Sequence, residues 1–244
     1  MPLRSTPPVP TTQTTPATGG LIGNDGQPIP LPFFMAIMEA IEAREPAAVG
    51  RSRLIALHAV ATARALLLSN DAVDAIRIGA LLSNIGMLSV PEAVLHKSDA
   101  LTHDELATIR HHPVLGADIL AVVPQLRHIL PIVLHHHEDW AGGGYPHSLN
   151  GEEIPIGARI IRVVETYDAL TSPRPYRPAF APADALQLLA NGCGQEFDPR
   201  VVSAFSNRLR RNLAIHDDVL DRWDDLQRQA RIWRLVANLE VSSQ

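Results

Sequence analysis

Apolar side chains recur along this chain at the spacing of an α-helix, and this feature limits its fold more than any other. A first helical face is formed by residues at positions i, i+3, i+4 and i+7, which are Phe34, Ile37, Met38 and Ile41. No stretch alternates apolar and polar residues with the period of two that is typical of a half-buried β-strand. The sequence therefore predicts an all-α protein whose folded region begins near residue 31.

Capping residues and a glycine mark the ends of the next two expected helices. The first is expected over residues 51–68. The Ser69-Asn70-Asp71 segment that follows can cap a second helix, because side-chain oxygens at this position accept hydrogen bonds from free backbone amides. The second helix is expected to run to Asn84 and to end at Gly86.

Proline and glycine shape the middle of the chain. Thr102 and Glu105 have the spacing of a capping box, and the helix that they open is expected to be distorted at Pro113, which lacks an amide donor. Another helix is expected over residues 124–138. Residues 139–155 hold four glycines and two prolines, so we expect a long surface loop there, of the kind that often carries function.

The helical pattern resumes after this loop. Helices are expected over residues 158–170 and from about residue 183. Asp198-Pro199 then provides an N-cap and a first-turn proline for another helix.

The composition divides the chain into three predicted segments. Residues 1–30 are rich in Pro, Thr and Gly and are predicted to be a flexible tail, because they contain few large apolar side chains to bury. Residues 31–213 are predicted to form the helical domain. Residues 214–244 are predicted to form an amphipathic C-terminal helix, whose apolar stripe consists of Val219, Trp223, Leu226, Ala230 and Trp233. This stripe either packs on the domain or forms a partner or homodimer face.

Charge and cysteine content narrow the class of partners and cofactors. The formal net charge is −5, so there is no broad basic field for nucleic acid. The single Cys193 excludes an internal disulfide and a thiolate metal cluster, which leaves histidine as the candidate soft ligand. Neither a membrane-spanning run nor a signal peptide is apparent, so we expect no membrane and a cytoplasmic location.

The middle of the chain carries a recognisable motif. The segments HHHEDWAGGGYPHSLNGEEIPIGARI (residues 135–160) and VVETYDALTSPRPYR (residues 163–177) closely resemble the signature region of the HD-GYP family, whose namesake triplet is Gly144-Tyr145-Pro146. The resemblance continues upstream through PEAVLHKSDALTHDELATIRHHPVLGADIL and downstream to EFDPRVVSAF. The resemblance implies an HD-superfamily helical bundle with a long loop that carries the Gly144-Tyr145-Pro146 triplet, here called the GYP loop. Such a bundle binds two or three metals and hydrolyses the bacterial messenger cyclic di-GMP.

Several positions depart from the family's metal-binding pattern. The family has a first histidine, the namesake His-Asp pair, a lysine and a loop aspartate where this chain has Arg51, Ser83, Asn84, Met87 and Ala141. Neutral Asn84 cannot bridge two cations as an anionic ligand does, and the guanidinium of Arg51 cannot coordinate a cation. The resemblance therefore predicts a degenerate member without the catalytic pair, in which Arg51 supplies some of the lost positive charge.

Other family ligand positions are kept. His112, His136 and His137 match the family's ligands, and Glu165 stands where the family has an aspartate. Three imidazoles and water suffice for one divalent ion, so the resemblance implies a residual site for Fe, Mn or Zn. In the alternative interpretation these are ordinary helix histidines, because successive helical side chains point about 100° apart and need not converge.

The resemblance also implies ligand and partner contacts. Arg174 and Arg177 match basic positions that hold phosphates, although a surface pair closing a turn would look the same. Asp168 matches a pocket position and could equally cap a helix or pair with Arg174. Tyr145 offers a ring for stacking on a ligand, or simply folds the loop back onto the domain.

The GYP loop is implied to be a partner surface as well. In the family this loop contacts GGDEF-type diguanylate cyclase domains. The residues of this chain that correspond to such a surface are Trp140, Gly144, Tyr145 and Pro146, with Trp140 and Tyr145 as expected anchors.

Three functions are compatible with these residues. The first is a non-catalytic signalling module that binds cyclic di-GMP, a protein partner or both. The second is an impaired cyclic di-GMP phosphodiesterase with one metal on His112, His136 and His137. The third is a structural interaction protein that uses the C-terminal helix alone.

Overall fold

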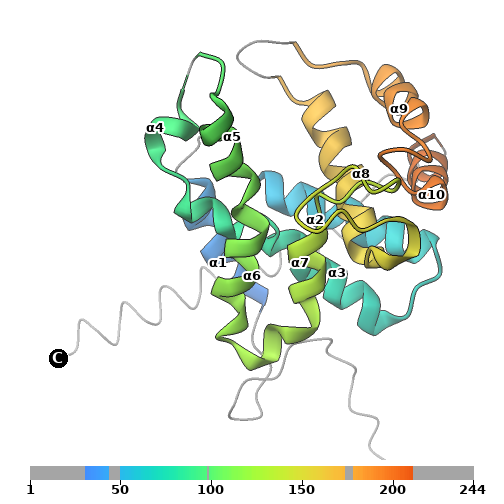
Figure 1. Cartoon of the computed structure of the whole chain (residues 1–244). Coiled ribbons are helices and arrows are strands. Elements are labelled where there is room, and N and C mark those ends of the chain that lie inside the picture. The colour runs from blue at the N-terminus through green and yellow to red at the C-terminus, as the bar shows by residue number, and fades with distance from the viewer. Residues whose placement is uncertain (1–30, 44–49, 98, 174–177, 211–244) are drawn as a thin grey trace, which may run out of the picture.

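The structure is a computed structural model, and it describes residues 31–43, 50–97, 99–173 and 178–210. These residues form a helical bundle without a β-strand, which confirms the predicted all-α class (Figure 1). The α-helices are α1 Leu31–Glu42, α2 Arg51–Ala65, α3 Asn70–Leu82, α4 Glu92–Leu95, α5 His103–Arg110, α6 His112–Ala121, α7 Leu130–His135, α8 Ile156–Thr171, α9 Pro182–Asn191 and α10 Pro199–Arg210. The 3₁₀-helices are η2 Ile85–Ser89, η3 Pro124–Ile129 and η4 Gly151–Glu153.

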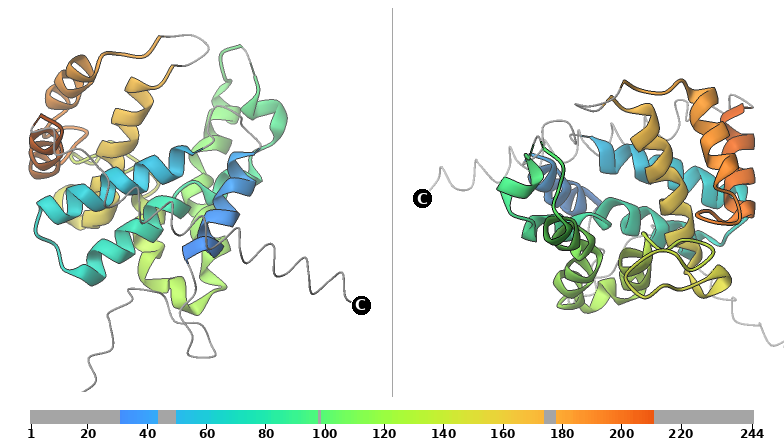
Figure 2. Two further views of the ribbon diagram at one scale, coloured as in Figure 1. Left: turned by 180° about the vertical axis from the view of Figure 1, so that it is seen from behind. Right: turned by 45° about the horizontal axis from the view of Figure 1, so that its top comes forward.

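Helices α2, α3 and α8 form the centre of the bundle. Helix α2 packs along α3, and α8 contacts α2, α3, α7, α9 and α10. Helices α9 and α10 lie on one side of the bundle, and α4 and α5 lie on the opposite side (Figure 2). Glycine allows the central elements to approach closely, because a Cβ atom at Gly157 of α8 would lie 2.7 Å from Ile132 of α7. The apolar stripes of these helices make a single core.

The capping predictions are confirmed where the structure describes them. Ser69 Oγ accepts a hydrogen bond from the Ala72 amide at the start of α3. Thr102 and Glu105 form the reciprocal capping box that opens α5. Asp198 Oδ1 accepts from the Arg200 amide at the start of α10. Local side-chain chemistry therefore sets these helix starts.

Two helices end earlier than predicted, and the first is α2, which ends at Ala65 and not at residue 68. Helix α3 ends at Leu82, before Asn84, and Gly86 lies within η2 and does not end the helix. The reason is tertiary, because a Cβ atom at Gly86 would lie 1.9 Å from the carbonyl oxygen of His112, so glycine lets η2 pack directly on α6.

The expected helix over residues 124–138 is also divided. It forms η3 followed by α7, with Pro131 in the first turn of α7. Proline lacks the amide that would continue a helix from the preceding turn, and it is favoured at a new helix start. By contrast, Pro113 acts as predicted, because α5 ends at Arg110 and α6 begins at His112.

Two predicted segments lie outside the described residues, namely the tail over residues 1–30 and the C-terminal helix over residues 214–244. One described stretch, Asn70–Ser89, is long and apolar enough to cross a membrane by length and composition. More than half of its most apolar window, 56%, is buried inside the bundle, as expected of a core element that combines α3 and η2.

Candidate metal and nucleotide site

A cavity of about 390 Å³ opens between α1, α2, α6 and α8. One wall is apolar, with Met38, Ile41 and Ile109 among its residues. The polar residues that line the cavity include Arg51, Asn84, His112, His137, Tyr145, Arg162, Glu165 and Asp168. Most of the predicted site residues that the structure describes therefore face one space.

Three histidines converge beside this cavity. His112 is the first residue of α6, and His136 and His137 directly follow α7. One ring nitrogen from each lies within 4.8 Å of the others. The packing of α6 against α7 therefore brings the three side chains together, and the residual metal site stays a prediction.

The hydrogen bonds of two rings fix which nitrogen is free. His112 Nδ1 lies 2.7 Å from Ile109 O, and His136 Nδ1 lies 2.6 Å from Val133 O. A carbonyl oxygen only accepts, so Nδ1 carries the hydrogen and Nε2 of each neutral ring is an acceptor. The two Nε2 atoms face each other at 3.2 Å. This is close to the spacing of roughly 3.3 Å between two ligands of a tetrahedral ion with bonds of about 2.0–2.1 Å, so the pair fits a cation.

Burial keeps these rings neutral. It lowers the pKa of His112 and of His136 to about 4, and it also lowers the pKa of His137. At neutral pH each ring therefore keeps the lone pair that a metal ligand needs.

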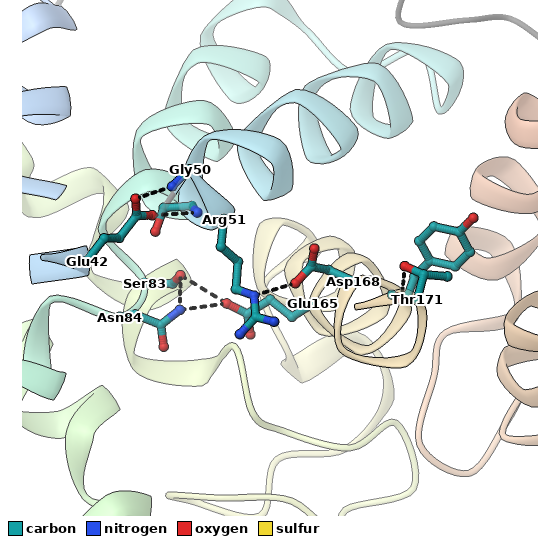
Figure 3. A network of polar contacts seen from close by, with 10 residues as sticks. Glu42, Gly50, Arg51, Ser83, Asn84, Glu165, Asp168 and Thr171 are labelled. Carbon is teal, nitrogen blue, oxygen red and sulfur yellow. Dashed lines mark hydrogen bonds and ion pairs between the residues drawn. The ribbon is translucent and has the colours of Figure 1, made fainter. Parts of the chain in front are cut away.

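Neutral donors hold the carboxylate of Glu165 on α8. Ser83 Oγ lies 3.2 Å and Asn84 Nδ2 lies 3.0 Å from Glu165 Oε1 (Figure 3). Burial raises the pKa of Glu165, while the neighbouring His112 and the two hydrogen bonds lower it. The group at this cavity whose ligand atoms all lie within 4.8 Å of one another holds the three histidines and does not include Glu165. The predicted fourth ligand is therefore engaged by Ser83 and Asn84.

Arg51, which also lines the cavity, forms an ion pair with Asp168. It is the first residue of α2, where Glu42 accepts hydrogen bonds from the amides of Gly50 and Ser52. Arg51 Nε lies 2.7 Å from Asp168 Oδ2, and the two side chains are 24% and 7% exposed (Figure 3). The structure thus pairs Asp168 with Arg51, a contact that the sequence did not indicate. Arg174 and Arg177 lie outside the described residues.

The GYP loop packs on the histidine cluster. The Tyr145 ring stacks on His137 with centroids 5.0 Å apart, and its amide donates to His137 O. Arg110 lies 5.6 Å from the Tyr145 ring centre, and burial raises the pKa of Tyr145 to about 12. A Cβ atom at Gly144 would lie 2.2 Å from the Asp139 amide nitrogen, so only glycine permits this course.

The remaining loop positions also contact the domain. Trp140 lies under the guanidinium of Arg159 at 5.6 Å, and Tyr145 and Pro146 are half-buried. Ala141 forms an isolated backbone bridge with Asn150. The two expected anchors, Trp140 and Tyr145, are therefore partly engaged within the chain.

Sequence reasoning missed Arg162. It lines the cavity from α8, donates to Asp139 Oδ1 from Nε and Nη2 at 3.0 and 2.8 Å, and donates to Thr166. Its position three residues before Glu165 places it on the same helical face, and this spacing is the signal that could have identified it.

Comparison with known proteins agrees with this geometry. A family model described as an HD domain matches residues 35–201. A cyclic di-GMP phosphodiesterase from Vibrio cholerae is 38% identical over 148 residues, which cover 57% of this chain and 30% of that protein. The cyclic di-GMP phosphodiesterase response regulator RpfG from Xanthomonas campestris is 41% identical over 140 residues, which cover 56% of this chain and 37% of that protein. The chain thus spans about a third of the length of these relatives.

The fold is similar to solved structures. A cyclic GMP-AMP specific phosphodiesterase from Vibrio cholerae superposes with a TM-score of 0.61 at 18% identity, over 81% of this chain and 52% of that one. An HDGYP protein from Bdellovibrio bacteriovorus superposes with a TM-score of 0.55 at 18% identity, over 73% of this chain and 60% of that one. This chain belongs to the HD domain family and is a member of its HD-GYP group.

Proposed function

We propose that this chain is a non-catalytic signalling module of the HD-GYP group that binds cyclic di-GMP, a partner protein such as a GGDEF domain, or both. One observation carries the proposal. The side chains that replace family ligands are bonded to the acidic residues of the site, with Ser83 and Asn84 on Glu165 and Arg51 on Asp168.

Charge balance explains why this arrangement disfavours a binuclear centre. Two divalent ions close together need bridging anionic ligands, and neither the amide of Asn84 nor the hydroxyl of Ser83 supplies a charge. The guanidinium of Arg51 is a permanent cation at the cavity wall and repels a metal ion placed nearby. Each of the two carboxylates already accepts from these protein donors, Glu165 through Oε1 and Asp168 through Oδ2.

The same cavity retains features that suit a nucleotide. Its volume of about 390 Å³ falls within the range of small-molecule pockets, which is roughly 300–1,000 Å³. Arg51 and Arg162 line it and can attract phosphate oxygens through charge-assisted hydrogen bonds. Tyr145 and the apolar wall provide surfaces for a base.

Calorimetric titration of cyclic di-GMP into the metal-free full chain tests the nucleotide half of the proposal. We expect measurable binding that weakens at least about tenfold in Arg174→Ala or Arg177→Ala, the loss expected when one charged hydrogen bond is removed. Arg200→Ala is the matched control, because Arg200 is exposed, pairs with Glu152 and is not among the residues that line the cavity. Absence of binding removes the nucleotide half and leaves the partner.

Titration of a purified GGDEF domain tests the partner half. The GYP loop is the proposed surface, with Trp140 and Tyr145 as its aromatic residues. We expect Trp140→Ala to weaken binding, while His128→Gln, an exposed position on η3 outside the loop, leaves it unchanged. Equal affinities of the two variants and the unmodified chain would assign the contact to another surface, such as the C-terminal helix.

The histidine cluster favours a second candidate, an impaired cyclic di-GMP phosphodiesterase. His112, His136 and His137 would hold one Fe, Mn or Zn ion through nitrogen atoms that already face one another. Such an ion, when bound, lowers the pKa of a coordinated water and polarises a phosphate oxygen. The chain's own residues would orient the ligand through Arg162 and Tyr145. Hydrolysis that requires His112 would favour this candidate over the first.

A further inference from the structure

A second group of potential metal ligands lies outside the cavity. It consists of His135 at the end of α7, Glu138 shortly after it, and His147 in the GYP loop. One ligand atom from each lies within 4.8 Å of the others, and none of the three residues lines the cavity. The group joins two segments, because His147 belongs to the loop and His135 to the helix before it.

The separation of two of these atoms suits a shared ion as well as a long hydrogen bond. His135 Nδ1 lies 3.4 Å from Glu138 Oε1. Hydrogen bonds between nitrogen and oxygen are usually about 2.7–3.2 Å long. Two ligands of a tetrahedral zinc ion with bonds of about 2.0–2.1 Å are roughly 3.3 Å apart. The ring centres of His135 and His147 lie 5.3 Å apart.

Glu138 is held in place for such a role. Its side chain is fully buried, with Oε1 accepting from the His147 amide at 2.8 Å and Oε2 accepting from the Leu149 amide at 3.2 Å. An ionised carboxylate has about four acceptor positions, so each oxygen keeps one for a further partner. A buried carboxylate charge is costly without a compensating cation, and a divalent ion would supply one.

The ligand set and the access route define the ion. Two imidazoles and a carboxylate suit zinc and similar divalent transition metals rather than magnesium or calcium. His147 is exposed and His135 is partly exposed, so an ion and a coordinated water reach the group from solvent.

We propose that His135, Glu138 and His147 form a second site for a divalent transition metal, with zinc the favoured ion, and that this ion fastens the GYP loop to the end of α7. The site does not depend on whether the chain binds cyclic di-GMP. Since His136 and His137 lie between His135 and Glu138, the ion would also restrain the segment that carries the histidine cluster.

Zinc titration of the chelator-treated full chain tests the site. We expect the unmodified chain to bind one more equivalent of zinc than His147→Gln, or to bind the last equivalent at least about tenfold more tightly. His147 is exposed, so this variant keeps the fold. His128→Gln is the matched control, because His128 is exposed on η3 and belongs to neither histidine group, and it is expected to bind zinc as the unmodified chain does.

Hydrogen exchange separates this site from the cavity cluster. Zinc is expected to slow exchange of the amides in residues 141–150 of the unmodified chain and of His128→Gln, but not of His147→Gln. Equal zinc stoichiometry and affinity in His147→Gln and His128→Gln would overturn the proposal. Loop exchange that zinc leaves unchanged in the unmodified chain would overturn it too.

Discussion

Asn84→Asp is the sharpest perturbation of the contact that holds Glu165. It replaces an amide donor 3.0 Å from Glu165 Oε1 by a second carboxylate. Two unit charges at this distance repel by about 5 kcal/mol at an effective dielectric constant of about 20. The folded protein relieves part of this by holding a proton between the two carboxyls, which costs about 4 kcal/mol at neutral pH for an ordinary carboxyl pKa. Because burial already raises the pKa of Glu165, we expect a loss of about 2–3 kcal/mol.

Urea unfolding of the metal-free full chain at pH 7 and pH 5.5 measures this loss. The folded state of the variant binds a proton that the unfolded chain does not bind at neutral pH, so its deficit is largest at pH 7 and shrinks as the pH falls. Asn84→Ala is the control, because it removes the donor without adding a charge and is expected to cost about 1 kcal/mol at both pH values. Equal stability of the two variants at pH 7, or a deficit that grows at pH 5.5, would show that residues 84 and 165 do not repel each other in the variant.

Three further predictions concern other parts of the chain. Gly144→Ala places a Cβ atom 2.2 Å from the Asp139 amide nitrogen. We therefore expect a lower midpoint of thermal unfolding and faster hydrogen exchange in the GYP loop. Unchanged exchange in the loop would contradict this. Burial, with the nearby Arg208, lowers the pKa of His58 to about 4, so this residue stabilises the fold above pH 6.5 and loses that contribution between pH 6.5 and about 4. Between pH 7.5 and pH 5.5, the free energy of unfolding measured in urea is expected to fall by about 1 kcal/mol less in His58→Gln than in the unmodified chain. An equal fall in both proteins would contradict this. If the C-terminal stripe forms a homodimer, Trp233→Ala shifts the full chain toward monomer in sedimentation, whereas an unchanged distribution assigns the stripe another role.

Local chemistry accounts for the parts of the fold that the sequence predicted correctly. The capping box at Thr102 and the N-cap at Asp198 depend on neighbouring residues alone, so their patterns specify helix starts. The end of α3 was misplaced because Gly86 serves a contact with α6, which lies far along the chain. A glycine in the sequence shows that the backbone is less restricted there, but it does not show whether the residue ends a helix or allows a close contact with another element.

The site was predicted in part for a related reason. The family resemblance identified His112, His136 and His137, but only the packing of α6 against α7 brings their nitrogens together. The contact between Arg51 and Asp168 joins residues on α2 and α8, and no local spacing encodes it. The predicted role of Arg51 as a substitute positive charge is consistent with this pair and stays a prediction.

Turnover of cyclic di-GMP by the full chain, reconstituted with Fe, Mn or Zn, distinguishes a non-catalytic module from an impaired phosphodiesterase. We expect no linear product above a protein-free blank, because Ser83, Asn84 and Arg51 leave the acidic residues of the site bonded to protein donors. Repeated turnover that is lost in His112→Gln and kept in the exposed control His128→Gln would contradict it, and would establish the chain as a metal-dependent phosphodiesterase.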